Sequence, residues 1–164
     1  MKYYVIHCKK YPNRKRMMEL QFKRFGITDV EWIEKWDADD PFVARVKAAT
    51  SSPLDLKNVS CCLKHFAALN HMVKENIQEA VILEDDVIFY PEYRDGPPTH
   101  RAGFLRLGLG VGVLEKNPPP PSYKIYITNN PGGSEAQWVS LEFAKFAMNL
   151  VNFDRTIDHY HYAL

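Results

Sequence analysis

Residues 80–89, AVILEDDVIF, place three consecutive carboxylates inside an otherwise apolar segment. The aliphatic and β-branched residues on either side predict a buried strand over 80–89. A carboxylate is costly to bury unless it is paired or binds a cation. Because side chains alternate along a strand, Glu84 and Asp86 are predicted to share one face and Asp85 to lie on the other.

The segments before this strand alternate between strand and helix patterns. Residues 3–8 and 30–33 read as strands, and residues 12–25 read as a helix that ends before Gly26. Ser60 is predicted to cap a further helix, whereas residues 37–56 are predicted to be mostly loop. This alternation predicts an α/β fold with a mostly parallel sheet covered by helices.

The segment from Arg94 to Ser122 holds most of the prolines and glycines of the chain and is predicted to be a long irregular loop, the least ordered part of the fold. Strand patterns return at 123–127 and 135–139, and Ser140 is placed to cap a last helix. We therefore expect one domain, residues 1–164, with an irregular loop at about 94–122.

The composition limits the classes of function. The chain has 164 residues, 46% hydrophobic and 25% charged, which excludes wholesale disorder. Its net charge of +1 gives no general case for nucleic acid or an anionic membrane as partner. No signal peptide or apolar run of about 20 residues is seen, so a soluble, cytoplasmic protein is expected. Cys8, Cys61 and Cys62 do not form a disulfide framework and are expected to be reduced, packed thiols.

Two carboxylates on one face at a strand end can hold a divalent cation, with substrate phosphates completing its ligands. The alternative is a strand that ends in solvent with acidic residues at its tip, and spacing alone does not separate the two. Basic residues crowd the first 24 positions, either as a solvated helix face or as an edge that faces phosphate. The glycine-rich residues 108–112 lack the spacing of a dinucleotide site. The pair His159 and His161 is by itself more typical of incidental surface residues than of a metal site.

Short motifs follow one another in an informative order. They are YVIH (4–7), YPNR (11–14), WDA (36–38), CLKH (62–65), AVILEDDV (80–87), QWVS (137–140) and ID (157–158). Together they resemble glycosyltransferase family 25, the group of lipopolysaccharide-type and collagen galactosyltransferases. The specific part is LEDDV with the C-L-x-H motif upstream. Cys61 stands where the family usually has glycine, and His7 where it usually has asparagine.

The resemblance implies a Rossmann-like nucleotide-diphospho-sugar transferase fold of the GT-A type, an α/β/α sandwich. It implies a glycosyltransferase (hexosyltransferase) that moves galactose or glucose from a uridine-diphosphate donor to a hydroxyl, with inversion and with Mn²⁺ or Mg²⁺. The acceptor would be a glycan, a lipid-linked or a protein hydroxyl, in lipopolysaccharide or glycoprotein glycan biosynthesis. The residues assigned by this reasoning are Glu84, Asp86 and His161 for the metal, Arg14, Asp37 and Asp85 for the donor, and Asp158 and Glu135 as candidate bases.

Two other functions fit parts of the sequence. A degenerate or truncated transferase domain would bind nucleotide sugar without turnover. A phosphotransfer or hydrolase domain would use the same acidic cluster, although the chain lacks a P-loop and a DxDxT-type nucleophile motif. An assay for product formed from labelled nucleotide sugars would distinguish both of these alternatives from an active transferase.

Overall fold

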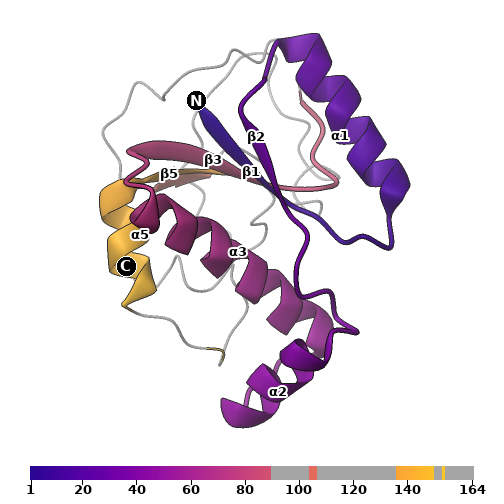
Figure 1. The fold of residues 1–164 in the computed structure, drawn as a ribbon, viewed down its shortest axis with the longest axis vertical. Coiled ribbons are helices and arrows are strands. Elements are labelled where there is room, and N and C mark those ends of the chain that lie inside the picture. The colour runs from indigo at the N-terminus through magenta and orange to yellow at the C-terminus, as the bar shows by residue number, and fades with distance from the viewer. Residues whose placement is uncertain (90–103, 107–135, 150–152, 154–164) are drawn as a thin grey trace, which may run out of the picture.

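The computed structural model describes residues 1–89, 104–106, 136–149 and 153. Its helices and strands follow the expected α/β alternation through the first half of the chain (Figure 1). In chain order they are β1 (Lys2–Ile6), α1 (Pro12–Phe25), β2 (Val30–Ile33), α2 (Pro41–Ala49), α3 (Leu56–Lys74), β3 (Glu79–Glu84), β4 (Phe104–Arg106), β5 (Ala136–Ser140) and α5 (Leu141–Met148).

The strands of the described part form one sheet in the order β2-β1-β3-β5-β4. β1 pairs in parallel with β2 on one side and with β3 on the other. β5 runs antiparallel to both β3 and β4, so β4 points the same way as β3. The mostly parallel sheet predicted from the sequence is therefore confirmed. The strand predicted at 135–139 is β5, but its antiparallel direction was not predicted.

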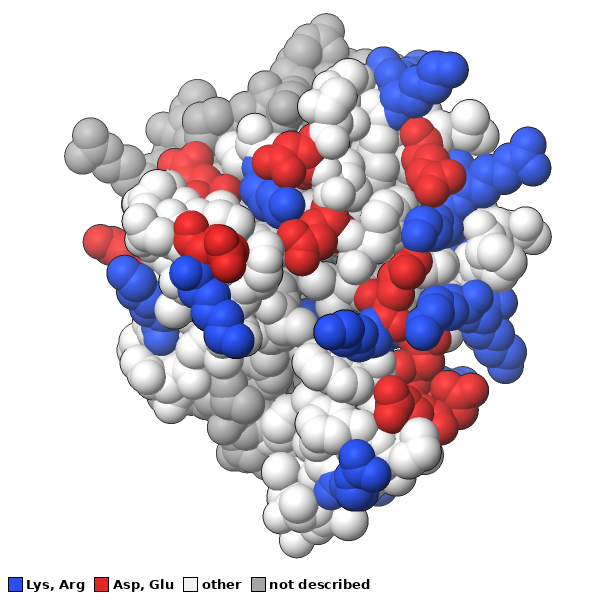
Figure 2. Space-filling view, in the orientation of Figure 1, with Lys and Arg blue, Asp and Glu red and all other residues white. Residues whose placement is uncertain are grey.

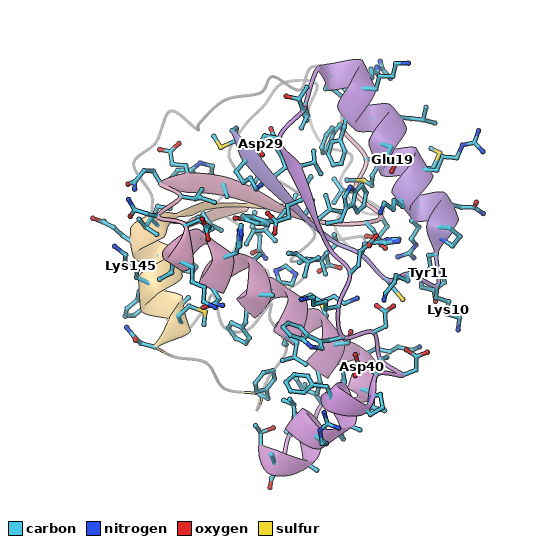
Figure 3. The ribbon with its side chains drawn as sticks, in the orientation of Figure 1. Lys10, Tyr11, Glu19, Asp29, Asp40 and Lys145 are labelled. Atoms are coloured by element: carbon cyan, nitrogen blue, oxygen red, sulfur yellow. The ribbon has the colours of Figure 1, made fainter. Side chains whose placement is uncertain are left out.

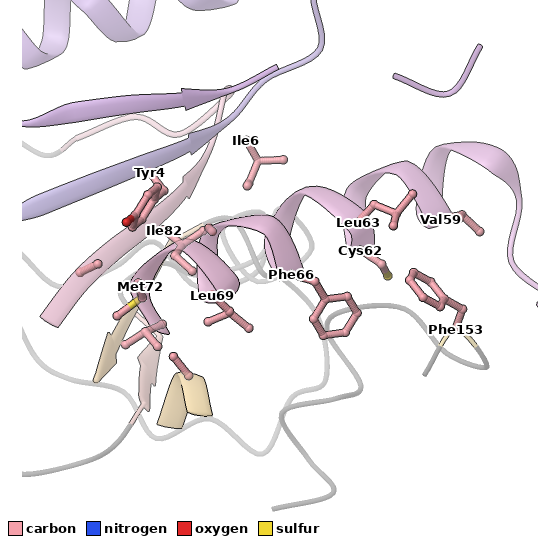
Figure 4. Close-up of a cluster of buried hydrophobic side chains, with 14 of the residues drawn as sticks. Tyr4, Ile6, Val59, Cys62, Leu63, Phe66, Leu69, Met72, Ile82 and Phe153 are labelled. Carbon is pink, nitrogen blue, oxygen red and sulfur yellow. The ribbon is translucent and has the colours of Figure 1, made fainter. Parts of the chain in front are cut away.

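Consecutive apolar side chains of β1 point to alternate faces of the sheet, and both faces are buried. Tyr3 and Val5 pack in one cluster with residues of α1, while Tyr4 and Ile6 pack in a second cluster with residues of α3 and α5. Figure 4 shows the second cluster, in which Phe66 of α3 lies against Phe153, with ring centroids 5.8 Å apart. Helices on both faces explain why both side-chain positions of the central strands are apolar.

Helix α1 begins and ends where its sequence predicts. Pro12 stands in its first turn, where its missing N–H costs no hydrogen bond. Gly26 ends the helix in the left-handed conformation with φ of 70°, and its N–H bonds the carbonyls of Phe22 and Lys23. At the other end of the chain, Ser140 caps α5 by accepting a hydrogen bond from the Phe143 N–H, as predicted.

Two predictions for the segment 37–60 are wrong. The segment read as loop contains α2, because Asp40 accepts from the Phe42 N–H as N-cap and Pro41 occupies the first turn. Helix α3 begins at Leu56 with Asp55 as its cap, five residues before the predicted cap Ser60. Ser60 lies inside α3 and donates instead to the Trp36 carbonyl at 2.5 Å.

The strand predicted at 80–89 is shorter than expected. β3 ends at Glu84, and Asp85 and Asp86 form a turn instead of continuing the strand to residue 89. Within the segment expected to be irregular, residues 104–106 form β4. The remainder of 94–122 and the strand predicted at 123–127 lie outside the described residues.

The three cysteines form no disulfide, and Cys62 of α3 is buried in the core, as its position on the apolar face predicted. No helix among the described residues is long and apolar enough to cross a membrane. On the face drawn in Figure 2, basic and acidic side chains alternate without a large patch of either sign.

Candidate functional site at the ends of β1 and β3

The carboxyl ends of β1 and β3 lie side by side, with Ile6 paired to Glu84. From β1 the chain continues through α1 to β2 on one side, and the next strand, β3, lies on the other side of β1. The order of the strands therefore reverses between β1 and β3. In open α/β sheets, ligands bind in the crevice outside such a reversal, so this edge is the place to look for a site.

Asp85 is the buried centre of this edge. Its side chain is 6% exposed, and its Oδ2 accepts hydrogen bonds from His7 Nδ1 at 2.7 Å and from the Cys8 N–H at 3.2 Å. Its other oxygen accepts from Arg14 at 2.9 Å. Donors on both oxygens satisfy the buried carboxylate, so Asp85 ties the end of β1 to the start of α1.

Arg14 bridges Asp85 and Asp86, with its Nη1 at 2.9 Å and 3.0 Å from their oxygens. Its guanidinium also lies over the Tyr11 ring, 4.8 Å from the centroid, and Figure 3 shows Lys10 and Tyr11 where the chain enters α1. The hydrogen bond to Asp85 raises the pKa of Arg14. The Arg14 side chain is still 44% exposed, so it is held in place and remains accessible to a ligand.

Asp86 differs from its neighbour because its side chain is 48% exposed. Partial burial raises the pKa of Asp86, and the nearby Glu84 and Asp85 carboxylates add to the rise against the opposing charge of Arg14. The rise is therefore mainly an effect of burial, which the charge of Arg14 offsets in part.

Asp37 forms a second polar centre beside the end of β1. It accepts hydrogen bonds from the buried Lys64 ammonium and from the Lys9 N–H. Lys64 also donates to the His7 carbonyl at 2.6 Å, which links this centre to β1. Burial alone would raise the pKa of Asp37, but the hydrogen bond and charge of Lys64 outweigh it and lower that pKa.

The residue before Asp37 has an unusual backbone. Trp36 has a φ of 62°, in the left-handed region that bulky side chains rarely adopt. Its carbonyl accepts the hydrogen bond of Ser60, and its ring lies 5.6 Å from that of Phe42. A strained backbone persists where its surroundings fix it, and here α2 and α3 hold the loop that carries Asp37.

Glu84 lies among residues of α3. Its Oε1 is 3.5 Å from His65 Nε2 and 3.8 Å from Cys61 Sγ. The alternation expected for a continuous strand, with Glu84 and Asp86 on one face, does not apply because β3 ends at Glu84. Glu84 instead contacts α3, while the turn brings both aspartates to Arg14.

The structure thus brings together Arg14, Asp85 and Asp86, while Glu84 and Asp37 each contact residues of α3. Glu135, Asp158 and His161 lie outside the described residues, and their predicted roles stay predictions. Sequence reasoning did not assign site roles to four residues that take part: His7, Cys61, Lys64 and His65. Two features of the sequence could have identified some of them: the four-residue spacing of Cys61 and His65 on a helix, and the polar residue at the end of β1.

The fold is that of an α/β protein with a mostly parallel sheet, and the strand reversal marks a candidate ligand site. Residues 1–99 match the model of glycosyltransferase family 25, described as an LPS biosynthesis protein. The chain belongs to this family, and the family points to glycosyltransferase activity. A comparison with curated proteins found no match.

Proposed function

We propose that this chain transfers a hexose, galactose or glucose, from a nucleotide-diphosphate donor to a hydroxyl acceptor, with inversion and with the help of Mn²⁺ or Mg²⁺. The acceptor is a glycan, a lipid-linked or a protein hydroxyl, and the fold is of the GT-A type. Membership of the family supports the reaction class. The observation that carries the proposal is Arg14, held by Asp85 at the strand reversal beside the more exposed Asp86.

The residues at this edge suit a nucleoside diphosphate. A guanidinium offers several donors in one plane, which matches the oxygens of a phosphate. Because Asp85 fixes Arg14, little side-chain freedom is lost when a ligand binds. In this proposal Asp85 positions Arg14, Arg14 contacts the phosphates or the uracil, and Asp37 holds the nucleoside from the neighbouring loop.

The carboxylates also fit a divalent cation. Asp86 and Glu84 offer oxygen ligands, which Mn²⁺ and Mg²⁺ prefer, and the raised pKa of Asp86 reflects its burial and the like charges beside it. A cation there would offset the negative charge that develops on the diphosphate leaving group. His161 is proposed as a further ligand. Asp158 and Glu135 are proposed as candidates for the base that takes the acceptor proton.

Replacing Asp86 with Asn tests this site. Asn keeps the shape but removes the charge that a hard cation requires, so binding of UDP in the presence of Mn²⁺ should weaken at least about tenfold. The variant should fold as the parent does. Above the pH at which Asp86 ionises, the substitution also relieves repulsion among the carboxylates of the cluster. Isothermal titration measures the binding, and thermal melts of both proteins check the fold.

The exposed Asp39 gives a control, since Asp39→Asn removes one carboxylate charge from a position outside the cluster. Its binding of UDP and Mn²⁺ should equal that of the parent. Equal binding by the Asp86→Asn variant and the parent would remove Asp86 from the site. If the parent binds UDP but gives no product from any labelled nucleotide sugar and acceptor, the alternative of a binding-only domain replaces the transferase.

A further inference from the structure

A second group of metal-ligating side chains lies on the α3 side of Glu84. Among the described residues, Cys61, His65 and Glu84 each offer one ligand atom, and these atoms lie within 4.8 Å of one another. Cys61 and His65 are four residues apart on α3, which places them on one face of the helix. Glu84 reaches them from the end of β3.

The separations suit a small tetrahedral cation. Glu84 Oε1 is 3.5 Å from the His65 nitrogen and 3.8 Å from the Cys61 sulfur. Around a tetrahedral Zn²⁺, with its usual bond lengths to sulfur, nitrogen and oxygen, neighbouring ligand atoms are about 3.3–3.5 Å apart. Small side-chain movements would therefore bring all three atoms to a common ion.

His65 gives an independent reason to expect a ligand. Its side chain is 1% exposed, and its Nε2 has no hydrogen-bond partner among the described residues. A buried polar nitrogen without a partner is costly. This nitrogen lies toward the Glu84 carboxylate, where a bound cation would satisfy it.

We propose that Cys61, His65 and Glu84 bind a divalent cation of the zinc class. One thiolate, one imidazole and one carboxylate form a ligand set that favours Zn²⁺ or Co²⁺ over Mg²⁺ and Ca²⁺. Glu84 is 27% exposed, which leaves access for water as a fourth ligand. This site does not require the proposed transferase function, although it shares Glu84 with the proposed donor site.

Cobalt provides the direct test, because a Co²⁺–thiolate bond has a charge-transfer absorption in the near ultraviolet. The full chain, freed of metal by a chelator, should develop this band on titration with Co²⁺ and lose it when Zn²⁺ is added. Cys61→Ser should abolish the band and weaken binding more than about 100-fold, since loss of even an outer-shell partner costs about 10- to 100-fold. Absence of the band in the parent would overturn the proposal.

Neighbouring cysteines supply the controls. Cys62 is buried in the core, so Cys62→Ala should keep the cobalt band, and Cys8→Ser is a second control should the first variant unfold. Loss of the band in a folded Cys62→Ala or Cys8→Ser variant would show that a cysteine other than Cys61 supplies the thiolate. That result would refute the site.

The donor site is measured separately. Cys61→Ser should still bind UDP with Mn²⁺, and Asp86→Asn should still show the cobalt band. Failure of UDP binding by the parent would count against the transferase proposal alone, whereas failure of the cobalt band would count against the zinc-class site alone.

Discussion

Lys64 is a buried cation, and Asp37 supplies its opposite charge. We predict that Asp37→Asn lowers the free energy of unfolding by about 3–5 kcal/mol, because it leaves a buried ammonium without a counter-charge. Denaturant unfolding measures this loss. Substitution of the exposed Asp39 by Asn should change the free energy of unfolding by less than about 0.5 kcal/mol. An equal effect of both variants would contradict the role of Asp37 as the counter-charge of Lys64.

The same pair makes stability depend on pH in a defined direction. The pKa of Asp37 is lowered in the folded protein, so its stabilisation is fully present above its unfolded value of about 3.9. It is lost as the pH falls through the lower folded value. The difference between the parent and Asp37→Asn should therefore shrink below about pH 4.

Single residues at the site could be predicted by type but not by partner. The acidic run at 84–86 stood out because carboxylates are unusual in an apolar segment. Asp85 bonds His7, which lies 78 residues earlier in the chain, and no local pattern encodes that contact. Lys64 is likewise paired through a loop that only the fold brings near it.

At the scale of the element, the end of α1 gives a clean test of backbone conformation. Gly26 has a positive φ, and a Cβ added there would meet no atom within 4 Å. Gly26→Ala should therefore destabilise the protein by about 1 kcal/mol through backbone strain alone. Gly26→Asn should cost less, because Asn tolerates this conformation. Equal costs for the two variants, measured by thermal unfolding, would point to a packing defect instead.

Helix ends with local signals were predictable, and those with competing signals were not. Gly26 and Ser140 end and begin helices as their residue types favour. Pro41 was misleading because proline marks both loops and first turns, and only the Asp40 cap distinguishes the two. Ser60 was misleading because its hydroxyl bonds Trp36, a contact from outside the helix.

At the scale of the whole molecule, β1 should be better protected than β2 in hydrogen exchange. It is paired on both sides, and Tyr3 and Val5 are fully buried. β2 lies at the edge of the described sheet and is only partly buried. Amides of residues 2–6 should therefore exchange more slowly than those of 30–33 by mass spectrometry. Faster exchange in β1 would contradict this sheet order.

The α/β class and the mostly parallel sheet could be predicted because strand and helix periods alternate in the sequence. The antiparallel β5 could not, because an apolar strand pattern carries no direction. The location of the site followed from the order of the strands, which places Glu84 beside Ile6.

The strand order also affects how the protein is made. β1 leaves the ribosome before either of its partners, and β3 begins at Glu79, long after β2 ends at Ile33. At about 5–20 residues per second, the nascent chain holds an apolar strand with one unpaired edge for about 2–9 seconds. Open strand edges promote aggregation. Translation speed and chaperone supply should therefore limit the yield of folded protein more strongly than its final stability does.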